Sequence, residues 1–243
     1  MSDKNRKCDC KCAGKQKRSE DRVSTKSTVR KSSSESGTDR KKVILKNAGN
    51  RICLTLKREA EKLDNSNLMK HLRTINRHKK LVLIHCIKAG IPIQGLLHDL
   101  SKYSPSEFIY GIRYYSGERS PNEGEREDYG FSYAWMHHKG RNKHHFEYWT
   151  DYNIEANKVM PVKMPLKYVV EMFCDRLAAG KVYKGKDYND ASPYEYFDKG
   201  RARRTIHQET SDFLEYLLKM LAEKGEKYTF AYIRKYRRTH DDY

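Results

Sequence analysis

Apolar residues recur along much of this chain at intervals of three and four residues, the spacing of one face of an α-helix. The longest such stripe runs through residues 68–89. Similar stripes predict helices over residues 51–64, 104–117, 165–184 and 205–224. The run Ser104-Pro105-Ser106-Glu107 predicts a capping box at the start of the 104–117 helix. The pattern therefore predicts an all-α fold, built as a helical bundle.

Segments without this periodicity divide the chain into parts. Residues 1–42 are rich in Lys, Arg and Ser and poor in apolar residues, so we expect a disordered basic tail there. We expect a linker with a short helix over residues 43–66, a helical domain over residues 67–235 and a C-terminal tail over residues 236–243. Residues 116–130 and 185–204 are expected to be loops. The segment from Tyr228 onwards is left open between a strand and a helix.

A His-Asp dipeptide, His98-Asp99, lies inside an apolar run whose members keep helical spacing: Ile93, Leu96, Leu97 and Leu100. We therefore predict that the dipeptide lies on a mostly buried helix. A buried carboxylate is costly unless it is paired or binds a metal. Two interpretations follow. Lys102 neutralises Asp99 from one turn away, or His98 and Asp99 together bind a divalent ion.

Three histidines of the 68–89 helix share one face, because they recur every seven residues: His71, His78 and His85. Seven residues rise about 10.5 Å along a helix, so at most one of these histidines can reach a given ion. We favour His78 as that ligand. His85 is expected either to support the ligands from behind or to be a core histidine.

Two further titratable residues lie on apolar helix faces. Asp175 lies on the stripe of the 165–184 helix, where a carboxylate needs a cation. A metal ligand is favoured there over a buried ion pair. His207 continues the inner face of the last long helix. It is expected to support the site or to be an ordinary core histidine.

Four histidines fall within nine residues: His137, His138, His144 and His145. They alternate with large aromatic residues that need burial, which favours inward-facing imidazoles over a polar surface turn. Gly140 is expected to end one helix and Asn142 to cap another. The two histidine pairs would then converge on one centre.

Composition adds expectations about partners and compartment. Of the 243 residues, 50 are Lys or Arg and 32 are Asp or Glu, a formal net charge of +18, which favours anionic substrates or polyanionic partners. The basic tail is expected to contact nucleic acid weakly. The six cysteines do not suggest a disulfide framework, which favours a reduced, cytoplasmic compartment. The role of Cys8, Cys10 and Cys12 is left open. No apolar run reaches membrane-spanning length, so no membrane contact is expected.

The order of ligand types, His78, His98-Asp99, paired histidines and then Asp175, resembles the HD-domain superfamily of metal-dependent phosphohydrolases. The runs from His98 to Pro105 and from His137 to His145 are similar to a narrower bacterial family of HD-like proteins without an assigned activity. The resemblance covers residues 67–235 and implies an HD-like helical bundle. It also implies one or two divalent ions (Mn, Fe, Ni, Zn or Mg) and the following ligands: His78, His98, Asp99, His137, His138, His144, His145 and Asp175.

We therefore expect an HD-type hydrolase that cleaves a phosphomonoester or a nucleotide with metal-activated water. Asp99 and Lys102 are the expected catalytic residues, and Lys102, Arg141 and Lys143 are expected to bind the phosphate. Two alternatives stay open. One is a di-iron oxygenase-like enzyme on the same helical scaffold. The other is a basic nucleic-acid-binding protein with a structural metal site.

Overall fold

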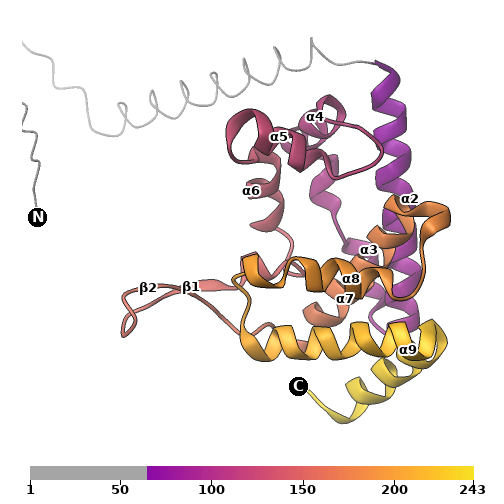
Figure 1. Cartoon of the computed structure of the whole chain (residues 1–243), viewed down its shortest axis with the longest axis vertical. Coiled ribbons are helices and arrows are strands. Elements are labelled where there is room, and N and C mark those ends of the chain that lie inside the picture. Colours follow the sequence, from indigo (N-terminus) through magenta and orange to yellow (C-terminus); the bar gives the residue numbers. More distant parts are fainter. Residues whose placement is uncertain (1–64) are drawn as a thin grey trace, which may run out of the picture. The chain divides into compact units, whose positions relative to one another are not determined.

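The structure is a computed structural model that describes residues 65–243. The expectations for the basic tail, for Cys8, Cys10 and Cys12, and for a helix over residues 51–64 lie outside the described residues. Residues 65–243 form an all-α fold with one small hairpin, as the apolar periodicity predicts (Figure 1). The α-helices are α2 (Asn65–Ala89), α3 (Pro92–Leu97), α4 (Pro105–Arg113), α5 (Pro121–Tyr129), α6 (Tyr133–Lys139), α7 (Leu166–Tyr183), α8 (Ser192–Lys199) and α9 (Gln208–Thr239). The short 3-10 helices are η1 (Leu100–Tyr103), η2 (Phe146–Tyr148), η3 (Gly185–Asp187) and η4 (Arg201–Arg203).

The apolar core lies where α2, α7 and α9 pack against one another. Side chains from all three helices are fully buried there: Val82, Cys86, Phe173, Leu177, Leu214, Leu217 and Leu221. The apolar faces predicted for α2 and α9 are therefore confirmed as buried. On α7 the buried face runs through Val170, Phe173 and Leu177 instead, and the predicted stripe, on which Asp175 lies, is only partly buried. Helix α2 also contacts α4, which packs against α5 and α6. This places α2 in contact with both groups of helices.

Two segments predicted to be loops contain helices. Within residues 116–130, α5 begins with Pro121 and ends at Gly130, whose φ of 77° is easily adopted by glycine. Helix α5 is largely polar, so it gives no apolar period. Its buried Glu125 accepts hydrogen bonds from the Tyr133 backbone N–H and the Ser132 hydroxyl at the start of α6. Within residues 185–204, α8 buries Phe197 against the core.

The C-terminal segment is helical, which answers the choice left open from Tyr228 onwards. Helix α9 continues to Thr239 and bends at Gly225, where φ is 73° and ψ is 172°. The last residue, Tyr243, packs back on the domain. Its hydroxyl donates to the Met164 carbonyl at 2.7 Å and lies 2.7 Å from the Thr210 hydroxyl. The tail predicted over residues 236–243 is thus in contact with the helical domain.

The hairpin was not predicted. Strands β1 (Thr150–Asn153) and β2 (Lys158–Pro161) pair antiparallel, with Thr150 opposite Pro161 and Asn153 opposite Lys158. Figure 1 shows the hairpin projecting away from the helices. Its residues are mostly exposed, so no buried face imposes an alternating pattern on the sequence.

The prediction that a mostly buried helix carries His98-Asp99 is wrong in two respects. Helix α3 ends at Leu97, before the dipeptide. The four apolar side chains used for the prediction are between 51% and 69% exposed: Ile93, Leu96, Leu97 and Leu100. The reason is that α3 approaches α2 through Gly95, where an added Cβ would lie 2.6 Å from the Cys86 Cβ. The smallest residue of α3 therefore faces the core and the leucines face outward.

Within residues 65–243, none of the helices combines the length and the hydropathy of a membrane-spanning segment.

Candidate metal centre

The dipeptide His98-Asp99 lies in the turn between α3 and η1. Asp99 has a left-handed backbone conformation, with φ 53° and ψ 28°. Asp adopts this region more readily than most residues other than glycine. Both side chains are buried, at 1% exposure for His98 and 2% for Asp99. The turn thus places a carboxylate and an imidazole side by side in the interior.

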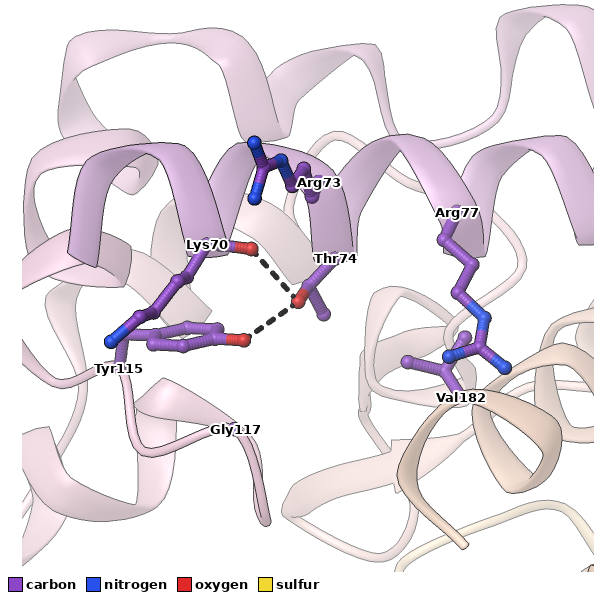
Figure 2. A pocket seen from close by; sticks show the side chains of 7 residues that line it. All are labelled: Lys70, Arg73, Thr74, Arg77, Tyr115, Gly117 and Val182. Atoms are coloured by element: carbon purple, nitrogen blue, oxygen red, sulfur yellow. Dashed lines mark hydrogen bonds between the residues drawn. The ribbon is translucent and has the colours of Figure 1, made fainter. Parts of the chain in front are cut away.

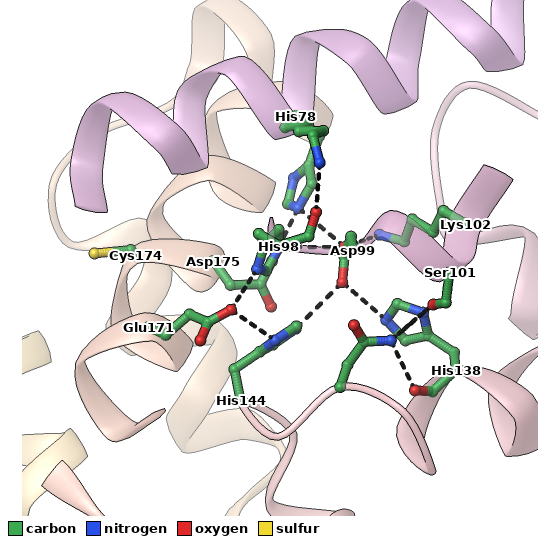
Figure 3. Close-up of polar contacts among 12 residues, drawn as sticks. His78, His98, Asp99, Ser101, Lys102, His138, His144, Glu171, Cys174 and Asp175 are labelled. Atoms are coloured by element: carbon green, nitrogen blue, oxygen red, sulfur yellow. Dashed lines mark hydrogen bonds and ion pairs between the residues drawn. The ribbon is translucent and has the colours of Figure 1, made fainter. Parts of the chain in front are cut away.

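One group of ligand atoms surrounds Oδ2 of Asp99 (Figure 3). His98 Nε2 lies 3.2 Å from this oxygen and His78 Nε2 lies 3.7 Å from it. Asp175 Oδ1, from α7, lies 3.0 Å from His78 Nε2 and 3.7 Å from His98 Nε2. Two imidazole nitrogens and two carboxylate oxygens therefore face one point, which matches a site for a first-row divalent ion. We call this set the first group.

A second group surrounds the other oxygen of the same carboxylate. Asp99 Oδ1 lies 3.2 Å from His138 Nε2 and 3.4 Å from His144 Nε2. His145 Nε2 lies 2.8 Å from His138 Nε2, and these four residues form one cluster with metal-ligand spacing. Asp99 is therefore shared by both groups, one oxygen in each.

Two carboxylates orient these imidazoles from behind. Glu171 Oε1 lies 2.9 Å from His98 Nδ1 and 3.1 Å from His144 Nδ1. Glu107 Oε2 lies 2.8 Å from His138 Nδ1. A carboxylate beside Nδ1 accepts a hydrogen bond from the Nδ1–H group, which leaves Nε2 free to act as the metal ligand. Glu171 thus orients one histidine from each group, and Glu107 orients a histidine of the second group.

Neither glutamate was identified from the sequence. Glu107 was predicted to close a capping box with Ser104, but the Ser104 side chain makes no capping hydrogen bond and Glu107 turns inward to the histidines. The prediction of a capping box is therefore wrong. Glu171 lies one turn before Asp175 on α7, so both share a helix face. That spacing was the signal that could have revealed it.

The loop after α6 fixes His138. Gly140 ends α6 as predicted. Asn142 does not cap a helix; its side-chain amide donates to the His138 carbonyl and to the Ser101 hydroxyl, both at 2.8 Å. Asn142 therefore ties the loop to η1, next to Asp99.

The electrostatics of the centre favour positive charge. Burial opposes protonation of His98, but the carboxylates of Asp99, Asp175 and Glu171 together outweigh it and raise the pKa of His98 well above its usual range. Burial also opposes ionisation of Asp99, yet His98, Lys102 and His138 together hold the Asp99 pKa well below its usual range. The pKa of His138 is raised in the same way, because Asp99 and Glu107 together outweigh burial. Burial, with the nearby His144, lowers the pKa of His145 well below its usual value, which keeps that imidazole in the neutral, metal-binding form.

Four buried atoms at the centre make no hydrogen bond: His78 Nε2, His98 Nε2, His144 Nε2 and Asp99 Oδ1. Buried polar atoms are nearly always hydrogen-bonded. Four unsatisfied atoms that face two common points are the arrangement expected of metal ligands. The donor set therefore fits two divalent ions, one in each group.

The remaining predicted site residues lie around this centre. Lys102 Nζ is 2.6 Å from Asp99 Oδ2, so it neutralises the carboxylate, and its side chain is 33% exposed. His137 contacts Glu107, at 2.6 Å, and is in neither group. Arg141 is exposed and donates to the His137 carbonyl. Lys143 is exposed and lies over the rings of two tyrosines.

The two histidines expected behind the ligands lie elsewhere. His85 is in the core, where its ring stacks on Phe230 and its Nδ1 is 3.3 Å from the Cys174 carbonyl. His207 precedes α9 as its N-cap residue. Within residues 65–243, neither histidine makes a hydrogen bond, ion pair or ring contact with a residue of the two groups. His85 is therefore a core histidine, whereas His207 is only half-buried.

The centre is accessible along one edge. The side chains of His98, Asp99, His138 and His144 are at most 4% exposed. On the opposite edge, Asp175 is 18% exposed and Lys102 is 33% exposed. The partial exposure of Asp175 and Lys102 indicates the side from which solvent reaches the first group.

Comparison with known proteins identifies the family of the chain but no characterised relative. No curated protein matches the chain, and no solved structure matches it. A family of unknown function (DUF5662) matches residues 67–220, which include every residue of both groups. The chain belongs to this family of unknown function, DUF5662.

Proposed function

We propose that this protein is a metal-dependent hydrolase of a phosphate ester. The observation that carries the proposal is the position of Asp99, whose two carboxylate oxygens each face a separate set of imidazole nitrogens. A carboxylate shared in this way is typical of two-metal hydrolytic sites. The order of the ligands along the chain, which resembles that of HD-domain phosphohydrolases, supports the same activity.

The ligand chemistry favours particular metals. The first group offers two imidazoles and two carboxylates, and the second offers three imidazoles and one carboxylate. Imidazole-rich sites suit Zn, Fe and Ni, and mixed sites also suit Mn, whereas Mg prefers oxygen ligands. When bound, two such ions supply an activated water and neutralise charge on phosphate oxygens.

The residues of the chain have distinct roles in this proposal. Asp99 would offer one carboxylate oxygen to each ion. Glu171 and Glu107 hydrogen-bond to Nδ1 of the ligating histidines, which fixes the orientation of the rings and directs Nε2 into the centre. Lys102, at the accessible edge, offers an ammonium group to a phosphate oxygen of the substrate. The buried side of the centre excludes bulk water, which strengthens these charge interactions.

Metal content and hydrolysis together test the proposal. The full chain without a histidine tag would be analysed for bound metals beside Asp99→Ala, and Glu226→Gln serves as a control. Glu226 is a carboxylate of α9 that pairs with Lys181 and Lys88 in another part of the domain. We expect about two metal equivalents in the native protein and in the control, and loss of both in Asp99→Ala.

A screen of phosphomonoesters and nucleotides follows with the same three proteins. The proposal requires hydrolysis that disappears in Asp99→Ala and persists in Glu226→Gln. Hydrolysis that survives in a folded Asp99→Ala protein would contradict it. Turnover that needs dioxygen and an iron-loaded protein would favour the oxygenase alternative instead.

A further inference from the structure

A second feature of α2 lies next to the metal centre: a pocket of about 290 Å³. Figure 2 shows α2 along one side of this pocket and Tyr115, which follows α4, on another. The Thr74 hydroxyl donates to the Lys70 carbonyl and lies 2.9 Å from the Tyr115 hydroxyl. The lining residues are Lys70, Arg73, Thr74, Arg77, Tyr115, Gly117 and Val182.

The pocket is strongly basic. Lys70, Arg73 and Arg77 line it together with no acidic residue. They lie three or four residues apart and thus share one face of α2. All three side chains are exposed, and no ion pair with another described residue is present for any of them. Like charges at this spacing destabilise a helix, so an anion between the three cations would relieve a repulsion built into α2.

The pocket and the metal centre share the same helix. Thr74 lies one turn before His78, a rise of about 6 Å, and Lys70 lies about 12 Å before it. Val182 of the pocket wall lies seven residues after Asp175 on α7, a rise of about 10.5 Å, so the two residues share one face of that helix. Asp175 is partly exposed, so the pocket and the partly exposed side of the centre lie along the same face of α7.

We infer that the pocket binds a second anionic group of the substrate, which makes the substrate a small organic bisphosphate rather than a simple phosphomonoester. This inference rests on the proposed hydrolase function. One phosphate would lie at the metal centre, and the other against the face of α2 that carries Lys70, Arg73 and Arg77. Guanidinium groups match the geometry of phosphate oxygens and bind them bidentately.

The size of the pocket favours a small substrate. Typical small-molecule sites have volumes of about 300–1,000 Å³, so this pocket lies at the lower limit. It has room for one phosphate and a short carbon body. A nucleic-acid strand would instead need a continuous basic groove with aromatic side chains for stacking, and Tyr115 is the single aromatic residue in this lining.

Binding of non-hydrolysable ligands tests the inference without enzyme turnover. The probes are α,ω-butane bisphosphonate and butylphosphonate, titrated calorimetrically into the full chain loaded with Mn²⁺. We expect the bisphosphonate to bind at least about tenfold more tightly, the effect of one or two charge-assisted hydrogen bonds. The double variant Arg73→Gln/Arg77→Gln should lose this advantage and bind both probes equally. Arg73→Lys/Arg77→Lys, which keeps the charge, should restore part of it.

Helix α9 offers a matched control. Arg234 and Arg238 are also exposed and lie four residues apart on one helix. Arg234→Gln/Arg238→Gln removes the same charge and should leave the bisphosphonate advantage unchanged. An equal loss in this control would overturn the inference, because the effect would then reflect net charge alone.

The outcomes separate this inference from the proposed function. Equal binding of both probes by the native protein overturns the inference, while Mn²⁺-dependent binding of butylphosphonate would still support the hydrolase. An advantage that survives in Arg73→Gln/Arg77→Gln also overturns it. Binding of a single-stranded oligonucleotide that depends on Arg73 and Arg77, without preference for the bisphosphonate, would assign the pocket to a nucleic acid and overturn it. If Mn²⁺ has no effect on either probe, the metal-dependent function fails, and with it the inference.

Discussion

The replacement Glu171→Gln examines how the centre is held together. A single oxygen, Glu171 Oε1, accepts hydrogen bonds from His98 Nδ1 and His144 Nδ1 at 2.9 and 3.1 Å. His98 belongs to the first group of ligands and His144 to the second. Glutamine keeps the length and shape of the side chain but removes the negative charge. The replacement therefore weakens the support of one ligand in each group.

The structure sets the expected size of the effect. Loss of a carboxylate behind a metal-binding histidine lowers metal affinity by about 10- to 100-fold, which corresponds to about 1.4–2.7 kcal/mol. Because Glu171 supports a histidine of each group, we expect a loss of this size for both ions. Glutamine keeps a side-chain oxygen that can accept from the two Nδ1 atoms, and Asp99 and Asp175 stay beside His98, so the protein without metal should not be destabilised strongly.

The assay is competition with a chromophoric chelator, which gives the affinity for Zn²⁺ or Mn²⁺ at each site. Thermal unfolding in the presence of excess chelator shows whether the fold is intact. Glu226→Gln is the matched control, because Glu226 is a carboxylate that pairs with lysines outside the centre. Unchanged affinity in a folded Glu171→Gln protein would refute the reasoning. An equal loss in Glu226→Gln would do so as well.

Three further predictions follow from other contacts. Glu107→Gln should weaken only the second ion, because Glu107 supports a histidine of the second group alone; metal analysis at limiting Zn²⁺ should fall from about two equivalents to about one. Gly95→Ala places a Cβ 2.6 Å from the Cys86 Cβ, so it should lower the free energy of unfolding by about 1–3 kcal/mol. Calorimetry should show a fall in Tm of about 2–4 °C per kcal/mol. The control Gly140→Ala, whose added Cβ has its nearest neighbour 3.4 Å away, should change the Tm little. Burial and a nearby lysine lower the pKa of His85 from 6.5 to about 4, so the unfolded chain binds its proton more readily and stability is lost as the pH falls from 6.5 towards 4. This loss amounts to about 3 kcal/mol. The free energy of unfolding, measured with urea at neutral and at acidic pH, should differ less between the two pH values in His85→Gln than in the native protein. An equal pH dependence in the two proteins would contradict the assignment to His85.

The long helices could be predicted because their apolar faces repeat over many turns. His78 could be predicted as well, because it is a polar residue on the buried stripe of α2. Asp175 was predicted from a stripe of α7 that is only partly buried, and Asp175 itself is 18% exposed. The clustering of His138, His144 and His145 was also visible in the sequence. Their assignment to one group and the exclusion of His137 depended on the loop tied down by Asn142, which no periodicity describes.

The failures have physical causes that can be named. Helix α5 is stabilised by its end residues and by Glu125 rather than by an apolar face, so a search for apolar stripes misses it. Helix α3 has only six residues and packs through Gly95, so its leucines misled the assignment of the buried face. Glu107 was assigned to a helix cap because local spacing allows it; the partner that it contacts in space, His138, lies 31 residues further along the chain.

The spacing of the ligands along the chain has a consequence for the lifetime of the protein in the cell. They come from α2, the turn after α3, α6, the loop after α6, and α7, so ions bound here would act as cross-links that close long segments of chain. By mass action, each bound ion adds stability that grows with the free metal concentration. Metal starvation would then populate opened forms that proteases recognise. The abundance of the protein would therefore follow the metal supply of the cell, independently of any change in its synthesis.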